Sequence, residues 1–181
     1  VQISPPQEHA VFPSRRYPWW QRYQPVSYQL ESRSGGRKAL TDMVQQCRRA
    51  GVDVYADAVI NHMAGVDQGL GSAGTPFTKY EYPGLYSSQD FNTCRQPVKD
   101  YNDAENVTQC ELVGLADLNT GSDYVQIRIV EYLSDLTDLG ISGFRIDAAK
   151  HIRSAELGQI LARYEQARGE DSYIYQEVID P

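Results

Sequence analysis

Charged side chains interrupt the segment 143–151 (GFRIDAAKH), which otherwise has the pattern of a buried strand. Arg145 and Asp147 alternate with the apolar Phe144 and Ile146, so on a strand the two charged side chains share one face. A nearby guanidinium favours the ionised form of a carboxylate, so this face is either exposed to solvent or part of a functional site. A solvated charged face would explain the alternation equally well. Helical patterns on both sides favour a parallel sheet covered on both faces, where buried charges must be paired or used.

The elements that would position this segment follow from the apolar periodicity. Apolar residues recur at helical spacing before Gly51 and before Gly140, which stand where each helix would stop. Residues 61–119 show little periodicity, and a connection of that length is either functional or a small subdomain. The expected order is a strand at 1–4, a helix at 37–50, a strand at 52–60, the segment 61–119, a helix at 122–139, the strand of Asp147, a helix at 154–168 and a strand at 173–179.

This order predicts an α/β fold with a parallel sheet, either closed into a barrel or open and doubly wound. The polar residues favour the barrel, because they follow the carboxyl ends of successive strands, and in a barrel these ends meet on one rim. An open sheet would also place ligands at these ends, but no strand is followed by the G-x-G-x-x-G turn of nucleotide-binding sheets. The polar residues concerned are Asp57, Asn61, His62, Arg145, Asp147, Lys150, His151 and Glu177.

Composition excludes several classes of partner. The 181 residues carry a formal net charge of −7, which argues against a nucleic acid, and no apolar run approaches the length of a membrane span. An uncharged substrate fits this charge better. Thirteen Tyr, four Phe and two Trp supply aromatic surface that suits the apolar faces of sugars as well as a protein core.

Several segments resemble signature regions of the α-amylase family of glycoside hydrolases. Residues 57–62 (DAVINH), 143–151 and 177–180 (EVID) look like three of the four signature regions, and 114–119 (GLADLN) looks like the short motif of the family's inserted domain. The run 19–28 (WWQRYQPVSY) narrows the resemblance to animal-type members, including bacterial enzymes of that type. One such motif would be weak evidence, whereas several in order are specific.

The resemblance implies a partial (β/α)8 TIM barrel, about strands 2 to 5, with a small irregular or β-rich domain B inserted after the third barrel strand. The expected boundaries are 1–62 and 119–181 for the two parts of the barrel and 63–118 for domain B. The chain begins within a strand, without an initiator Met, and it ends just after another strand. We therefore expect a fragment of a longer protein, truncated at both ends.

The chemistry implied by the resemblance is cleavage of a glycosidic bond with retention. This mechanism uses one carboxylate as nucleophile and a second, protonated carboxyl group as acid and then base. Asp147 matches the nucleophile and Glu177 the acid/base. Arg145 would keep Asp147 ionised, and the apolar and aromatic neighbours of Glu177 would help that residue to keep its proton. An ion pair or a solvated strand end would explain either carboxylate alone, but their joint occurrence in motif order favours catalysis.

Substrate contacts are also implied by the resemblance. The aromatic residues within 19–23 would stack on glucose rings, although such a cluster could equally anchor a loop. His62 would hydrogen-bond to sugar hydroxyls, and the pair 150–151 would shape the subsites on the aglycone side. Asp57 would orient Arg145 from beneath. The expected substrate contacts are Trp19, Trp20, Tyr23, His62, Arg145, Lys150 and His151.

Calcium is the implied metal. Its preference for oxygen ligands suits the side chains of Asn61 and Asp117 together with the backbone carbonyls of Thr108 and His151. Because Asn61 and Asp117 are far apart in sequence, the ion would tie the inserted segment to the barrel. Asp117 could instead cap the next helix, although it lies several residues early for that role. The resemblance also implies a chloride ion bound by Arg145, with its other ligands outside this chain.

The three cysteines indicate an oxidising environment. Cys94 and Cys110 both fall in the inserted segment, where a disulfide would stabilise a loop-rich structure. By the resemblance, Cys47 would pair with a cysteine that precedes this chain. A secreted, extracellular protein is expected.

These features predict a calcium-dependent enzyme that hydrolyses internal α-1,4-glucosidic bonds of starch, glycogen and malto-oligosaccharides, acting as a monomer without nucleic-acid or membrane partners. A related α-glucosidase or transglycosylase is an alternative, against which the Trp19-Trp20 pair argues. A noncatalytic relative that uses the barrel for interaction is another, against which the presence of both Asp147 and Glu177 argues. The family's third catalytic carboxylate falls outside these residues, so we expect the 181-residue chain alone to be inactive.

Overall fold

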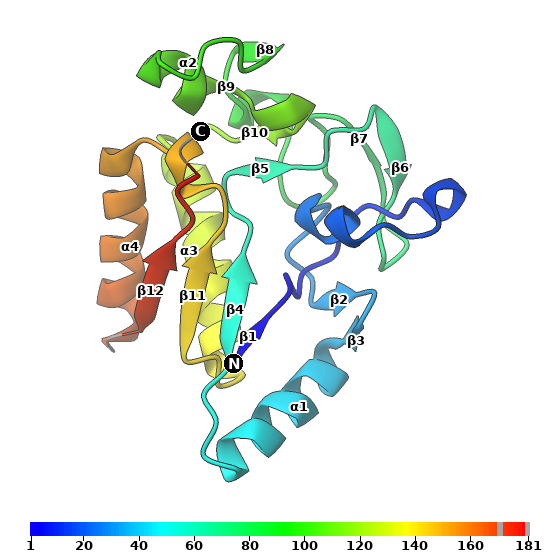
Figure 1. Cartoon of the computed structure of the whole chain (residues 1–181), viewed down its shortest axis with the longest axis vertical. Helices are drawn as coiled ribbons and strands as arrows, with labels where there is room; N and C mark the ends of the chain where they lie inside the picture. The colour runs from blue at the N-terminus through cyan, green and yellow to red at the C-terminus, as the bar shows by residue number, and fades with distance from the viewer. Residues whose placement is uncertain (170–171, 180–181) are drawn as a thin grey trace.

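A four-stranded parallel sheet forms the centre of the computed structural model, which describes residues 1–169 and 172–179. The strand order is β1–β4–β11–β12, and each neighbouring pair is parallel (Figure 1). All four carboxyl ends therefore meet at one edge of the sheet, where the side chains that follow the strands gather. The strands are β1 (Gln2–Ile3), β4 (Tyr55–Ala58), β11 (Gly143–Ile146) and β12 (Tyr173–Gln176).

Two amphipathic helices, α3 (Asp123–Asp138) and α4 (Ser154–Arg168), pack against each other and cover the sheet. In α3 the buried side chains of Ile129, Leu133 and Leu136 recur at a spacing of three to four residues. That spacing places them on one face of the helix, and this face joins the apolar core. Among the described residues, no helix is both long and apolar enough to cross a membrane.

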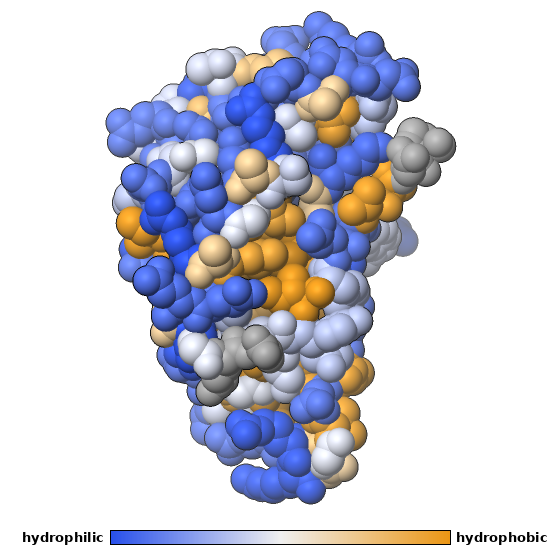
Figure 2. Space-filling view, turned by 90° about the vertical axis from the view of Figure 1, so that its left-hand side faces the viewer, coloured by the Kyte–Doolittle hydropathy of each residue, from blue (hydrophilic) through white to orange (hydrophobic). Residues whose placement is uncertain are grey.

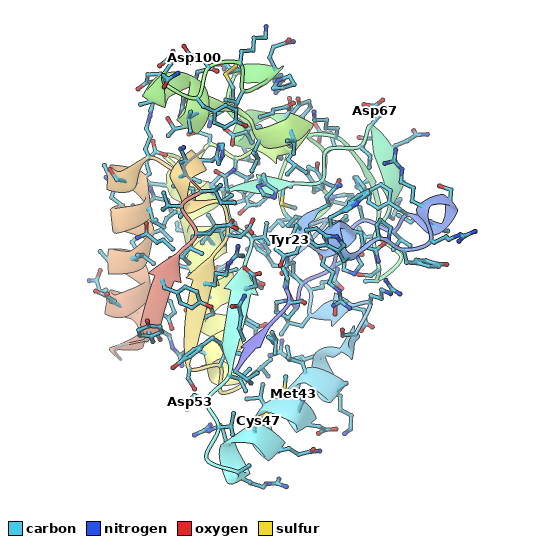
Figure 3. The ribbon with its side chains drawn as sticks, in the orientation of Figure 1. Tyr23, Met43, Cys47, Asp53, Asp67 and Asp100 are labelled. Carbon is cyan, nitrogen blue, oxygen red and sulfur yellow. A yellow bond between two sulfur atoms is a disulfide. The ribbon has the colours of Figure 1, made fainter. Side chains whose placement is uncertain are left out.

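The helix α1 (Arg37–Arg49) lies below the sheet in Figure 1 and fully buries one of its residues, Val44. It carries the free cysteine, Cys47, whose sulfur lies 3.8 Å from that of Met43 (Figure 3). The pairing of Cys47 with a cysteine outside this chain stays a prediction.

The predicted helices agree with the structure to within one residue at each end, whereas the predicted strands are longer than the observed ones. The strand expected at 52–60 pairs only over Tyr55–Ala58, and the one expected at 173–179 only over Tyr173–Gln176. Val59 and Ile60 leave the sheet but remain fully buried. A run of apolar residues indicates that a segment is buried but not that it pairs with a neighbouring strand, so the predicted strands are too long.

The segment between β4 and α3 contains short elements rather than one long loop. β5 pairs with β10 in antiparallel fashion, so the two ends of the segment meet with Asp117 opposite His62. The expected disulfide joins Cys94 to Cys110. The expected boundaries of domain B stay a prediction. The elements are β5 (His62–Met63), β6 (Gln68–Leu70), β7 (Pro76–Thr78), β8 (Cys94–Pro97), α2 (Ala104–Gln109), β9 (Cys110–Glu111) and β10 (Ala116–Asp117), and a hairpin of β2 (Glu31–Ser32) and β3 (Gly35–Gly36) precedes them.

An apolar patch occupies the middle of the side on which α4 and β12 lie (Figure 2). Large apolar side chains exposed along β12 and just after it are those of Tyr173, Val178 and Ile179. Among the described strands, β12 is one edge of the sheet and β1 the other. The structure thus contains an open parallel sheet of the kind that a barrel includes, and the closed barrel stays a prediction.

Candidate active site

Arg145 is the centre of a cluster of carboxylates at the carboxyl edge of the sheet. The strand register places Arg145 beside Asp57 on one side and Tyr175 on the other. Its Nη1 donates to Asp57 Oδ1 at 2.5 Å and to Asp147 Oδ1 at 3.0 Å, and its Nη2 pairs with Glu177 Oε1. One guanidinium therefore holds three carboxylates, and two of them are the residues predicted to do the chemistry.

The backbone after β11 turns sharply and brings Asp147 close to Glu177. Ala148 has a left-handed conformation with φ of 50°, which ends the strand and starts the short 3₁₀ helix Ala149–His151. The Ala148 N–H donates to Glu177 Oε2 at 3.0 Å. The Asp147 N–H donates to the carbonyl of Ala58 at 3.0 Å. A backbone hydrogen bond thus holds the Glu177 carboxylate and another holds the main chain of Asp147, in addition to the contacts with Arg145.

The electrostatic state of Asp147 differs from the prediction. Its side chain is 9% exposed, and burial, followed by the negative charges of Asp57 and Glu177, raises its pKa to about 7. Arg145 opposes this shift but does not cancel it, because the same guanidinium is shared by three carboxylates. Arg145 thus favours the ionised form of Asp147, as expected, but burial and the two neighbouring carboxylates outweigh its effect on the pKa.

The surroundings of Glu177 also differ from the prediction. The expected apolar neighbours Val178 and Ile179 are 60% and 69% exposed, so they do not form an apolar pocket around the carboxyl group. The Tyr175 hydroxyl donates to Gln2 rather than packing on Glu177. The contacts of Glu177 are instead polar, with Arg145 and the Ala148 N–H, because the strand leaves the core at this point.

A cleft of about 790 Å³ opens in front of this cluster, and the predicted aromatic residues line it. Tyr23 lies between the N-terminal loop and the carboxyl ends of the central strands (Figure 3), and its hydroxyl donates to Asp57 Oδ2 at 2.8 Å. Trp19 is 73% exposed and stands edge-to-face against Tyr23, with ring centroids 5.8 Å apart. Trp20 packs on Phe12 at 5.0 Å. The exposed Trp19 ring offers a stacking surface, whereas Trp20 also anchors the loop.

His62 lines the cleft but is 1% exposed, and protein atoms engage both of its ring nitrogens. Nε2 lies 3.0 Å from the Tyr23 carbonyl, and Nδ1 lies 3.3 Å from the side-chain nitrogen of Asn61. Burial lowers the pKa of His62 to about 4, so the ring is neutral at pH 7. The predicted hydrogen bond to a sugar would have to replace the one to Tyr23.

A second, smaller cavity of about 310 Å³ adjoins the first, and Lys150 and His151 line it. The two cavities share Leu112, Ala148 and Glu177. No sequence pattern had indicated Leu112 or Tyr101, whose ring stands edge-to-face against His151 with centroids 6.2 Å apart. Both lie in the inserted segment, where periodicity carries little signal.

A separate polar site surrounds Asp117, which is 3% exposed. Among the described residues, the side-chain hydrogen bonds to its carboxylate come from the amides of Asn61, at 3.4 Å, and Asn92, at 2.8 Å. Burial raises the pKa of Asp117 to about 8. The sequence had indicated Asn61 and Asp117 as a pair but had missed Asn92, which no motif marked.

The other two expected calcium ligands lie on elements that contact each other. His151 Nδ1 lies 2.9 Å from the carbonyl of Val107, and Val107 precedes Thr108 in α2. No group of three or more His, Cys, Asp or Glu within the described ranges has the arrangement of a metal site. An ion bound here would therefore rely on amide and carbonyl oxygens around a single carboxylate.

Comparison with known proteins assigns the chain to a family. Residues 19–174 match the model of the alpha-amylase catalytic domain. The chain belongs to the alpha-amylase family. The match includes Asp57, Arg145 and Asp147, whereas Glu177 lies just beyond its end.

Individual alpha-amylases align with almost the whole chain. The alpha-amylase of Thermomonospora curvata is 57% identical over 187 residues, covering 99% of this chain and 31% of that protein. The alpha-amylase of Tribolium castaneum is 50% identical, covering 99% of this chain and 38% of that protein. The crystal structure of alpha-amylase I from Eisenia fetida in complex with maltohexaose superposes with a TM-score of 0.93 at 41% identity, covering 99% of this chain and 39% of that one. The chain thus spans between about 30% and 40% of the length of these alpha-amylases.

Proposed function

We propose that the protein containing this chain hydrolyses internal α-1,4-glucosidic bonds of starch, glycogen and related oligosaccharides with retention of configuration. The observation that carries the proposal is the pairing of Asp147 and Glu177 with one arginine at the floor of an aromatic cleft. The maltohexaose complex of the Eisenia fetida relative supports a glucan as the ligand of such a cleft. The completed barrel, with the inserted segment as its domain B, is part of the same proposal.

In the proposed mechanism, Asp147 attacks the anomeric carbon and Glu177 protonates the leaving oxygen, then deprotonates the water that releases the product. Asp147 must be ionised for the first step, and its hydrogen bond to Arg145 favours that form. Glu177 must carry a proton, so its ion pair with Arg145 has to open when substrate binds. Once that ion pair opens, Arg145 would interact only with Asp57 and Asp147, and its interaction with the Asp147 nucleophile would become stronger.

We further propose a calcium ion beside Asp117, because the residues there fit one. A buried carboxylate held only by neutral amides among the described residues carries an uncompensated charge, and a hard cation would supply the missing compensation. Asn61 and Asp117 would bind the ion through their side chains, and Thr108 and His151 through their carbonyls. The bound ion would supply structural cohesion between the inserted segment and the sheet.

The surroundings of Arg145 do not fit the proposed chloride ion. Its Nη1 and Nη2 are already engaged by three carboxylates, and a further anion would add to a site that has more negative than positive charge. Secretion stays part of the proposal and is supported by the disulfide between Cys94 and Cys110.

The test of this proposed function uses the full-length protein that contains the chain. Incubation with amylose should abolish iodine staining well before reducing ends accumulate, which marks endo-acting cleavage. The first products, followed by proton NMR, should have the α-configuration, which marks retention. Release of glucose from chain ends at constant iodine staining would instead support an α-glucosidase, and no cleavage would support a noncatalytic relative.

A further inference from the structure

One wall of the cleft is a backbone loop held in an unfavourable conformation. The 3₁₀ turn Leu112–Gly114 and Leu115 line the cleft, and Val113 within the turn has φ of 46°. Left-handed conformations are disfavoured for β-branched residues, and Val113 is also 79% exposed, so its own side chain contributes little burial to offset the strain. Contacts elsewhere must therefore hold this turn.

Those contacts come from a largely buried ion pair that adjoins the turn. Glu111, which immediately precedes it, has a side chain only 3% exposed and pairs with Lys79, Nζ to Oε2 at 2.9 Å. The same Nζ donates to the Gly114 carbonyl at 3.0 Å, so Lys79 joins the start of the turn to its end. The Tyr80 hydroxyl donates to the other oxygen of Glu111. Lys79, Tyr80 and Glu111 are called the clamp below.

The clamp is itself fixed on several sides. Tyr80 has φ of 69°, a second left-handed conformation, and its ring lies between the guanidinium of Arg95 at 4.2 Å and the ring of Phe91 at 5.4 Å. Glu111 follows Cys110, which the disulfide anchors. Gly65 also packs against the turn, since a β-carbon added there would come within 2.5 Å of the Gly114 carbonyl oxygen, the same atom that accepts from Lys79.

We propose that Lys79, Tyr80 and Glu111 are positioning residues that hold the turn 112–115 as a rigid wall of the cleft, and so determine how tightly a glucan is bound. This inference rests on the proposed function. A buried ion pair is weak evidence for stability alone, because removing two charges from water costs about as much as their attraction returns. Here the pair also bonds to the backbone of a strained turn at the binding surface, which assigns it a geometric role.

The experiment compares three variants of the full-length protein. Lys79→Met leaves Glu111 buried without its cation, so it should lower the thermal midpoint as well as weaken substrate binding. The double variant Lys79→Met/Glu111→Leu removes both charges, so its thermal midpoint should return to the wild-type value. The hydrogen bond to the Gly114 carbonyl is still absent in this variant. The matched control is Lys38→Met, which breaks the ion pair with Asp42 on the exposed face of α1.

For the double variant we expect KM for soluble starch to rise about tenfold, as for loss of one charge-assisted hydrogen bond, with kcat within about twofold of the wild type. Limited proteolysis should cut the double variant within 112–115 faster than the wild type. The control should match the wild type in both measurements. A double variant with wild-type KM and wild-type proteolysis would overturn the clamp.

The two proposals fail in different ways. A wild-type protein that leaves starch intact refutes the proposed function, whereas the rate of cleavage within 112–115 still decides whether the clamp holds the turn. A double variant with wild-type KM and wild-type proteolysis, in an enzyme that hydrolyses starch, refutes the clamp and leaves the function standing.

Discussion

Carboxylates lie in two regions near the carboxyl edge of the sheet, and the regions differ in what surrounds the negative charge. Asp57, Asp147 and Glu177 share the guanidinium of Arg145. Asp117, by contrast, receives its side-chain hydrogen bonds from neutral amides among the described residues. Burial raises the pKa of Asp147 to about 7 and that of Asp117 to about 8.

The difference indicates two separate tasks. At Arg145 the excess of carboxylates leaves room for a proton, which is useful in a reaction that transfers protons at neutral pH. Among the described residues, the side-chain hydrogen bonds to the Asp117 carboxylate come from two amides and not from a second acid or base, and the neighbouring oxygen atoms suit a cation. In the proposed function, the same physical cause, burial of an acid, therefore serves chemistry in one region and cohesion in the other.

Removing the shared cation should have the largest effect. Arg145→Met leaves three carboxylates around an apolar side chain, so we expect loss of starch hydrolysis and a decrease of about 3–5 kcal/mol in the free energy of unfolding. Thermal unfolding and reducing-sugar release by the full-length protein measure both. Arg37→Met, which breaks an exposed ion pair with Asp135, is the control and should change either value little. Equal effects of the two substitutions would refute the central role of Arg145.

Removing calcium should have the next largest effect. A chelator should lower the free energy of unfolding of the wild type by about 2.7 kcal/mol if calcium is present at a hundred times its dissociation constant. In Asp117→Asn the chelator should have little further effect, because the only carboxylate expected to bind the ion is absent. Asp100→Asn, an exposed site in the same segment (Figure 3), should keep the wild-type response. An unchanged response of Asp117→Asn would exclude calcium at this site.

The pH dependence of kcat/KM should separate the two regions further. Asp147 has its pKa raised to about 7 and must lose its proton to act as nucleophile, so kcat/KM should fall as the pH drops below about 7. Asp57 is one of the charges that raise this pKa, so Asp57→Asn should move the acid limb to lower pH. Asp117→Asn should leave the position of the limb unchanged. An acid limb that moves with Asp117→Asn and not with Asp57→Asn would contradict the separation.

The sequence predicted the parts of this structure that depend on local pattern. The helix α3 was predictable because its apolar residues Ile129, Leu133 and Leu136 recur at helical spacing, which can be recognised from the sequence alone. The shared face of Arg145 and Asp147 follows in the same way from strand alternation. Both features need only neighbours within a few residues.

Features that depend on contacts between distant residues were not predictable from local pattern. Asn92 meets Asp117, and Lys79 meets Glu111, across 25 and 32 residues of irregular chain. The raised pKa of Asp147 depends first on its burial and then on the carboxylates that share one guanidinium with it, and motif order reveals neither. The register of the sheet and the fold of the inserted segment determine these contacts, and both required the structure.

The most direct test of the central claim is the rate of reducing-sugar release from soluble starch by full-length Asp147→Asn. The substitution keeps the shape of the side chain and removes the nucleophile, so kcat/KM should fall about 10⁴-fold or more. Asp53→Asn is the matched control, because Asp53 is exposed and precedes β4, at the end of the sheet opposite the cluster (Figure 3), and it should retain wild-type activity. Wild-type activity in Asp147→Asn would contradict the account.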